Sequence, residues 1–84
     1  MIYKIEITNK AYKELNKLPS KEYPRIRDAI NSLANNPHPH NSIKLTDTEN
    51  EYRMRIGNYR ILYTIENKIL LITVFKISDR KDAY

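Results

Sequence analysis

The chain has 84 residues, a formal net charge of +5 and no cysteine. A chain of this length forms one domain with a modest core, and the lack of cysteine excludes a disulfide framework and a thiolate metal site. No apolar run approaches the ~20 residues of a membrane span, and no signal-peptide core is present. We therefore expect a single domain over residues 1–84, located in the cytoplasm and away from membranes. The basic charge favours an anionic partner, either a nucleic acid or an acidic protein.

The first part of the chain predicts a strand followed by two helices. Apolar and charged residues alternate over residues 2–8, which is typical of a half-buried strand. Apolar residues at helical spacing then predict a short amphipathic helix over residues 10–18, capped by Asn9. The same pattern predicts a second helix over residues 21–35, capped by Ser20. Because the connection is short, we expect the two helices to form an antiparallel hairpin.

Residues 36–50 are polar and irregular, and they predict a long loop. His38 and His40 lie in this loop, but two histidines without a thiol or a third ordered ligand fall short of a metal site. We therefore expect no metal ion and no cofactor. Lys44 comes just before the next strand. Its apolar neighbours could anchor it near a ligand, although the spacing fits a plain surface lysine equally well.

The most informative stretch is residues 52–63, which predicts two strands joined by a tight turn. Apolar residues alternate with arginine, and a glycine–asparagine pair separates the two runs. A two-residue turn places Arg55 opposite Arg60, with Arg53 on the same face. Like charges opposed across two strands destabilise a hairpin by a few tenths of a kcal/mol, up to ~1. The arrangement therefore indicates either an anion-binding face or an ordinary solvated strand face.

The remainder of the chain predicts one further strand and a charged tail. Residues 69–75 are apolar on both faces, so this strand is predicted to be the most buried of the sheet. Residues 76–84 are mostly charged and read as a frayed terminus. The predicted order is β-α-α-β-β-β, an α+β fold in which a helix hairpin packs on a small antiparallel sheet.

These features together resemble the RelE/ParE toxin superfamily of bacterial and archaeal toxin–antitoxin modules. The resemblance rests on the element order, the Lys44-Leu45 lead-in, the arginine-rich hairpin and the Arg80-Lys81-Asp82-Ala83-Tyr84 ending, and it covers essentially the whole chain. It implies a RelE-like fold and a ribosome-dependent endoribonuclease that cuts messenger RNA in the A site. In this reaction the 2′-hydroxyl attacks the adjacent phosphate, leaves a cyclic phosphate and needs no metal. Such a toxin needs a neutralising antitoxin of the RelB type, and the +5 charge favours an acidic one.

The resemblance also implies which residues form the site. By position, the expected catalytic residues are Arg60, Arg80 and Tyr84. The expected RNA contacts are Lys44, Arg53, Arg55 and Lys81. Arginine offers a planar fork that matches phosphate oxygens, and phosphoryl transfer needs its charge neutralised. Arginine effectively does not lose its proton, so Arg53 and Arg55, where the best-known relative has lysines, are poor candidates for the general base. The base is then either Tyr84 or absent.

Two alternatives stay open. A ParE-like inhibitor of DNA gyrase would share the fold, and fold alone does not decide function. A catalytically weak basic binding module would carry the same arginines. The lack of a clear base supports this second alternative, as does Asp79, which stands where many relatives carry a histidine. The set of Arg60, Arg80 and Tyr84 favours the nuclease.

Overall fold

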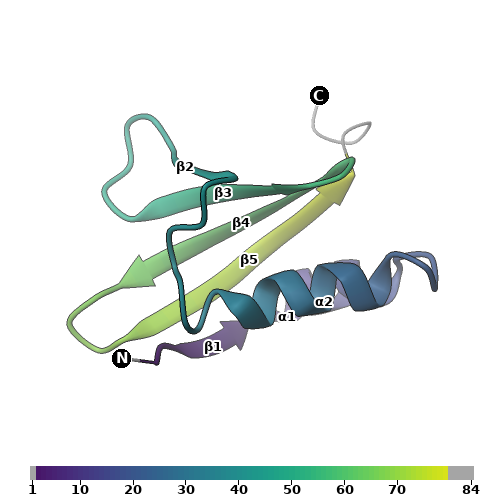
Figure 1. The fold of residues 1–84 in the computed structure, drawn as a ribbon, viewed down its shortest axis with the longest axis horizontal. Coiled ribbons are helices and arrows are strands. Elements are labelled where there is room, and N and C mark those ends of the chain that lie inside the picture. Colours follow the sequence, from purple (N-terminus) through teal and green to yellow (C-terminus); the bar gives the residue numbers. More distant parts are fainter. Residues whose placement is uncertain (1, 80–84) are drawn as a thin grey trace.

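Five strands form one sheet, and two helices cover one of its faces (Figure 1). The structure is a computed structural model that describes residues 2–79 of the chain. Its elements are β1 (Lys4–Ile7), α1 (Asn9–Asn16), α2 (Tyr23–Ser32), β2 (Ser42–Lys44), β3 (Glu51–Ile56), β4 (Tyr59–Glu66) and β5 (Leu71–Asp79). The predicted α+β architecture is confirmed. Neither α1 nor α2, the two helices of the described chain, is long and apolar enough to cross a membrane.

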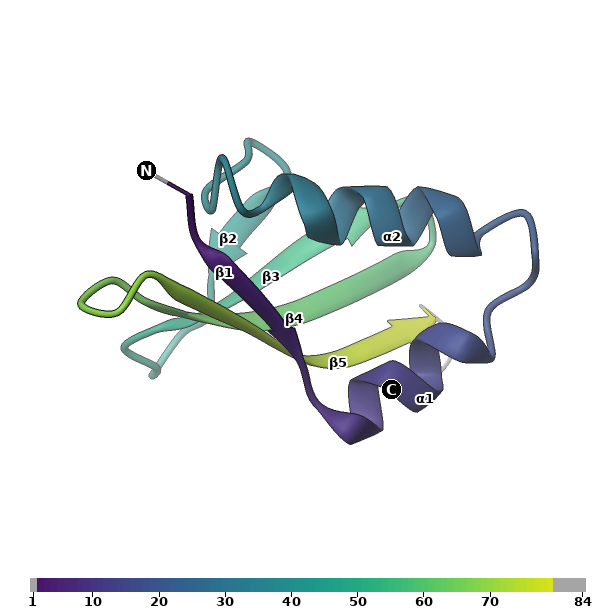
Figure 2. The same cartoon turned by 90° about the horizontal axis from the view of Figure 1, so that it is seen from below.

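Both helices begin at residues other than those predicted. Thr8 caps α1, because its hydroxyl oxygen accepts a hydrogen bond from the Ala11 N–H at 3.2 Å, and Asn9 is already the first helical residue. Glu22 occupies the cap position of α2 without a side-chain hydrogen bond, and Ser20 lies in the preceding turn. The two helices run in roughly opposite directions along the same face of the sheet, as predicted (Figure 2).

The sheet has the strand order β1-β5-β4-β3-β2 and is mixed, which corrects the prediction of an antiparallel sheet. β1 pairs in parallel with β5, whereas the other neighbouring strands are antiparallel. A parallel pair requires a long crossover connection, and here the chain passes through both helices and three strands before it returns. A fifth strand, β2, lies inside the segment that was predicted to be a loop. It pairs with β3, so that Ile43 lies opposite Arg53.

The last strand starts later and ends later than predicted. Leu70 takes a left-handed φ of 51° in the preceding turn, so β5 begins at Leu71 rather than two residues earlier. The strand continues to Asp79 through residues that were predicted to fray. β5 is also not the most buried strand: it has three buried residues, whereas β4 has five. β4 lies between two long strands, β3 and β5, along its length, whereas the second half of β5 extends beyond the short β1.

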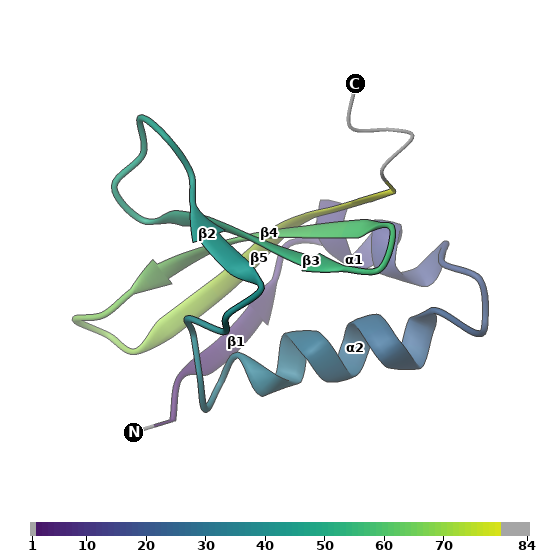
Figure 3. The ribbon, with the colours of Figure 1, turned by 45° about the horizontal axis from the view of Figure 1, so that its top comes forward.

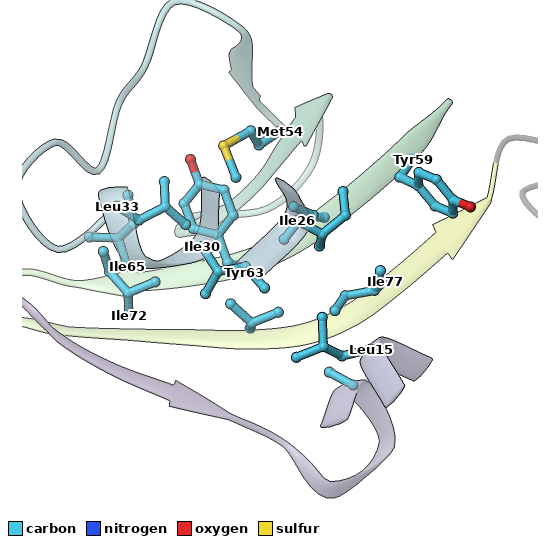
Figure 4. Packing of buried hydrophobic residues seen from close by; sticks show 13 residues of the cluster. Leu15, Ile26, Ile30, Leu33, Met54, Tyr59, Tyr63, Ile65, Ile72 and Ile77 are labelled. Carbon is cyan, nitrogen blue, oxygen red and sulfur yellow. The ribbon is translucent and has the colours of Figure 1, made fainter. Parts of the chain in front are cut away.

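The core lies between the helices and the sheet (Figure 4). Leu15 from α1 and Ile26 from α2 are fully buried, as is Tyr63 from the middle of β4. The Tyr63 hydroxyl donates a hydrogen bond to the Pro37 carbonyl oxygen at 2.9 Å, which ties the loop after α2 to the sheet. Tyr52 stacks on Tyr63 with ring centroids 5.8 Å apart. From the loop, the His38 ring lies edge-on to Tyr52, with ring centroids 5.1 Å apart. The segment that was predicted to be a solvated loop is therefore partly fixed by this aromatic contact and by the hydrogen bond to Pro37.

A side chain from α1 completes the hydrogen bonding of β5 where β1 ends. The last residue pair of β1 and β5 is Ile7 with Val74. Further along, the Glu14 carboxylate accepts a hydrogen bond from the Ile77 N–H at 2.8 Å. Ile77 is only 4% exposed, so this N–H would otherwise be a buried donor at the sheet edge. Glu14 thus holds the second half of β5 against the first helix.

Candidate nucleic-acid interface

Three arginines lie on the face of the sheet that the helices leave open. Arg55 is directly opposite Arg60, as the two-residue turn predicted, and Arg53 is opposite Leu62. The alternating residues Met54 and Ile61 are buried on the helix side. Because successive side chains of a strand point to opposite faces, the arginines point away from the helices. Figure 3 shows α2 on one side of the sheet and the open face on the other.

A small hollow lies at the β3–β4 turn, between two of these arginines. It has a volume of about 140 Å³ and is lined by Arg55, Gly57, Asn58, Tyr59 and Arg60. Gly57 has a φ of 59°, which suits the first central position of a type II′ hairpin turn. One water needs only ~10–15 Å³ of such space, so the hollow can hold a phosphate-sized anion.

The arginines differ in how far they are exposed to water. Arg60 is buried, with 9% of its surface exposed, whereas Arg55 is exposed and Arg53 is intermediate. Arg60 is held in β4, which lies inside the sheet between β3 and β5. A charge in a partly desolvated position interacts more strongly with a nearby anion than a charge in bulk water does. Of the two arginines that line the hollow, Arg60 therefore carries the charge that water screens less.

Tyr59 also lines the hollow, and the sequence analysis did not single it out. Burial raises the pKa of Tyr59 above its ordinary value of 10.0, and the nearby negative charges of Asp79 and Glu22 raise it further. The hydroxyl thus keeps its proton at neutral pH and can donate a hydrogen bond, but it is not a base. It points toward the end of β5 (Figure 4). In the sequence, the position of Tyr59 directly before Arg60, at the end of the turn, was the feature that could have identified it as a site residue.

The remaining predicted residues do not all join this group. Lys44 lies on β2 opposite Tyr52, so the register assigns it to the helix side of the sheet, away from the arginines. Arg80, Lys81 and Tyr84 lie outside the described residues. The last described residue, Asp79, pairs with Tyr59, so β5 ends beside the hollow. Within residues 2–79, no group of three or more histidine, cysteine, aspartate or glutamate side chains is placed to hold a metal ion.

Lys76 adds a basic side chain that the sequence analysis also missed. It lies opposite Leu62, in line with Arg53 across β4. Because the predicted strand ended at Phe75, Lys76 was assigned to the tail. It also lines a larger groove, of about 570 Å³, between α1 and the end of β5, together with Lys10 and Lys17. The groove also has apolar walls and the carboxylates of Glu14 and Asp79, and it shares Tyr59 with the hollow.

Comparison with known proteins gives consistent matches along the whole chain. A family model described as the ParE toxin of type II toxin–antitoxin systems, parDE, matches residues 5–84. The chain is 31% identical over 87 residues to a candidate toxin, RelE1, of Methanocaldococcus jannaschii, and the match covers 100% of this chain and 97% of that protein. It is 29% identical over 83 residues to toxin RelE of Mycobacterium tuberculosis, with 98% and 86% covered. The crystal structure of the archaeal RelE–RelB complex from Pyrococcus horikoshii OT3 contains a similar chain, with a TM-score of 0.86 and 32% identity over 99% of this chain and 100% of that one.

Proposed function

The chain belongs to the RelE/ParE toxin superfamily and is a RelE-type toxin of a toxin–antitoxin system, and we propose that it cleaves messenger RNA in the ribosomal A site. The observation that carries this proposal is the opposed pair of Arg55 and Arg60 around a phosphate-sized hollow. The guanidinium groups of two opposed strands line the hollow, so an anion bound there would meet donors from both strands. A ribosome-bound messenger presents such an anion in the cytoplasm at every nucleotide.

In the proposed reaction the protein supplies charge and alignment. The 2′-hydroxyl oxygen forms a bond to phosphorus, the bond to the 5′-oxygen breaks, and the leaving oxygen takes up a proton. Arg60 from the sheet and Arg80 from the tail stabilise the charge that builds up on the phosphate, and this effect is larger in the transition state than in the ground state. Arg53, Arg55 and Lys81 hold the RNA backbone, and Lys44 contacts RNA at the sheet edge. The product is a 2′,3′-cyclic phosphate, formed without a metal ion.

The proton of the 2′-hydroxyl needs an acceptor, and the described residues of the hollow offer none. The arginines stay protonated, and the raised pKa of Tyr59 keeps its hydroxyl neutral. Tyr84 is then the candidate base; otherwise the arginines lower the barrier without one. Because the site lacks a strong general base, we expect cleavage to depend on the ribosome. Correct orientation of the substrate on the ribosome lowers the barrier and partly replaces the missing base.

The test is primer extension on a translated messenger, with and without the protein. The expected result is cleavage in register with the reading frame, much slower cleavage of naked RNA, and no loss of activity with EDTA once ribosome integrity is controlled.

Arg60→Ala should lower the single-turnover cleavage rate by ~10²-fold or more, while Arg27→Ala, a change on α2, should leave this rate unchanged. Tyr84→Phe should lower the cleavage rate by a similar factor if the hydroxyl transfers a proton. It should lower the rate little if the ring only stacks on a nucleobase. Equal rates on naked and ribosome-bound RNA, or a metal-dependent cut leaving a 3′-hydroxyl, would contradict the proposal.

A second candidate function is inhibition of DNA gyrase, and the match to the ParE family model favours it. The same open basic face would then bind a different target. A supercoiling assay with purified gyrase separates the two functions. Inhibition of gyrase at concentrations that leave a translated messenger uncut would replace the nuclease proposal.

We also propose an acidic antitoxin of the RelB type as the partner. The relative from Pyrococcus horikoshii was crystallised as a RelE–RelB complex, which supports this. The net charge of +5 favours an acidic chain. The groove between α1 and β5 has three lysines and two carboxylates beside apolar walls, which suits a peptide with charged and apolar side chains. A segment bound there would continue beside Tyr59 toward the arginines, and so cover the face that receives RNA.

A further inference from the structure

We propose that Arg25 is a positioning residue of the hairpin site and that it acts through Gly57 at the β3–β4 turn. This inference rests on the proposed function, because the site in question is the hollow between Arg55 and Arg60. Arg25 belongs to α2, on the other side of the sheet, and nothing in its sequence context singles it out. Figure 3 shows the start of α2 beneath the β3–β4 turn.

The geometry at Gly57 is specific. A Cβ atom built on Gly57 would lie 2.9 Å from Arg25 Nη1, 3.0 Å from Nη2 and 3.1 Å from Cζ. Three atoms of the planar guanidinium are therefore at nearly the same distance, which means that the group lies flat against the glycine. A Cβ at this position would push the guanidinium aside, so Gly57 both takes the left-handed φ of the turn and leaves room for Arg25.

The backbone of Arg25 is held firmly in α2, but few contacts fix its guanidinium group. The next residue, Ile26, is fully buried against the sheet, which fixes this part of α2. The Arg25 side chain is 54% exposed, and its ion pair with Glu22 is long, with 3.8 Å between Nη1 and the carboxylate oxygen. A surface pair of this length contributes little. The position of the guanidinium is therefore set mainly by its packing on the turn.

The turn in question connects the two arginines of the site. Arg55 is two residues before Gly57, and Arg60 is three residues after it, so a displacement of the turn changes how both guanidinium groups face the hollow. A misplacement of ~1 Å at a reacting centre can lower a rate by ~10²-fold. For the smaller displacement expected when Arg25 is removed, we expect a loss of roughly tenfold.

The experiment compares Arg25→Gln, Arg25→Lys and the matched control Arg27→Gln in the full chain. Steady-state cleavage of ribosome-bound messenger gives kcat and KM, and amide hydrogen exchange of the free protein follows residues 56–59. Both Arg25 variants should lower kcat roughly tenfold with KM little changed and should speed exchange at the turn, with unfolding temperatures close to wild type. Lysine should not rescue, because it lacks the flat group that packs on the glycine. Arg27→Gln should match wild type in every measurement.

A double-mutant cycle identifies Gly57 as the route of the effect. Gly57→Asn adds a Cβ that displaces the Arg25 guanidinium. It also strains the backbone at this φ, but that strain is present with and without Arg25→Gln and therefore cancels in the cycle. Gly57→Asn and Arg25→Gln should each lower kcat, and the double variant should be no slower than the slower single variant. Additive losses, full activity of Arg25→Lys, or loss in Arg27→Gln would each overturn the inference. A wild-type protein that cuts no RNA would refute the proposed function, and unchanged exchange at the turn would separately refute the role of Arg25.

Discussion

The hydrogen bond between Glu14 and the Ile77 N–H offers a direct test of how α1 stabilises the functional end of the sheet. Glu14→Ala removes the acceptor at 2.8 Å and leaves a donor with no strand partner beside α1, in a residue that is 4% exposed. A hydrogen bond to a charged group contributes ~1.5–3 kcal/mol, and a buried unsatisfied donor costs a similar amount. We therefore expect Glu14→Ala to lower the free energy of unfolding by about 2 kcal/mol. In a domain of this size, that corresponds to a fall of about 8–16 °C in Tm.

Glu14→Gln separates the hydrogen bond from its charge. The glutamine side-chain oxygen can still accept from the Ile77 N–H, but without the charge the bond is about half as strong, so we expect a loss of about 1 kcal/mol. Lys13→Ala, on the exposed side of the same helix, is the control and should stay within ~0.5 kcal/mol of wild type.

Urea unfolding gives the three free energies, and amide exchange reports on the Ile77 N–H itself. Exchange at Ile77 should be faster in Glu14→Ala than in Glu14→Gln, and unchanged in Lys13→Ala. Because β5 leads directly from Ile77 to Asp79, where the tail begins, Glu14→Ala should also slow RNA cleavage at temperatures where the protein is still folded. Equal stability of Glu14→Ala and Lys13→Ala, with the protection of Ile77 intact, would refute the reasoning.

Two further predictions concern alkaline stability and the antitoxin. Burial raises the pKa of Tyr63 above 10.0, so the neutral side chain stabilises the fold below pH 10, and this contribution is lost as the pH rises through the folded-state pKa. Tyr63→Phe removes the hydrogen bond to Pro37 and should lower the free energy of unfolding by about 1 kcal/mol near pH 7. In urea unfolding above pH 10, the variant should lose stability less steeply than wild type, because it has no hydroxyl to titrate. The antitoxin should bind the full chain with an affinity that falls as salt rises, and changing Arg53, Arg55 and Arg60 together to glutamate should weaken a co-purified complex strongly. A partner held equally well by that folded triple variant would show that it does not cover the arginine face.

The sequence predicted the hairpin register because a two-residue turn leaves little freedom. Once Gly57 and Asn58 form the turn, the opposition of Arg55 and Arg60 follows from the geometry of an antiparallel pair. The parallel pairing of β1 was not predictable in the same way. Alternation over residues 2–8 defines which face is buried, but it does not say which strand lies alongside or in which direction.

Other differences have local causes. Leu70 was counted into a strand because it is apolar, yet it occupies a left-handed turn position that leucine seldom takes. β2 has only three residues and lies in a polar segment, so it is too short to show the alternation of apolar and polar residues that identifies a strand. Tyr59 and Arg25 were missed because their roles depend on neighbours from distant parts of the chain, which are Asp79 for Tyr59 and Gly57 for Arg25. The roles of Arg80, Lys81 and Tyr84 stay predictions, since these residues lie outside the described part of the chain.

The position of β5 in the sheet has a consequence for the synthesis of the protein. β5 follows all the other described strands in the sequence, but it lies between β1 and β4 and joins β1 to the rest of the sheet. A nascent chain that ends before Leu71 holds β1 without its strand partner and α1 without the Ile77 donor, so its long-range contacts cannot form. Contacts between residues far apart in the sequence form late and slowly. The sheet formed by residues 2–79 therefore closes only after β5 has been synthesised.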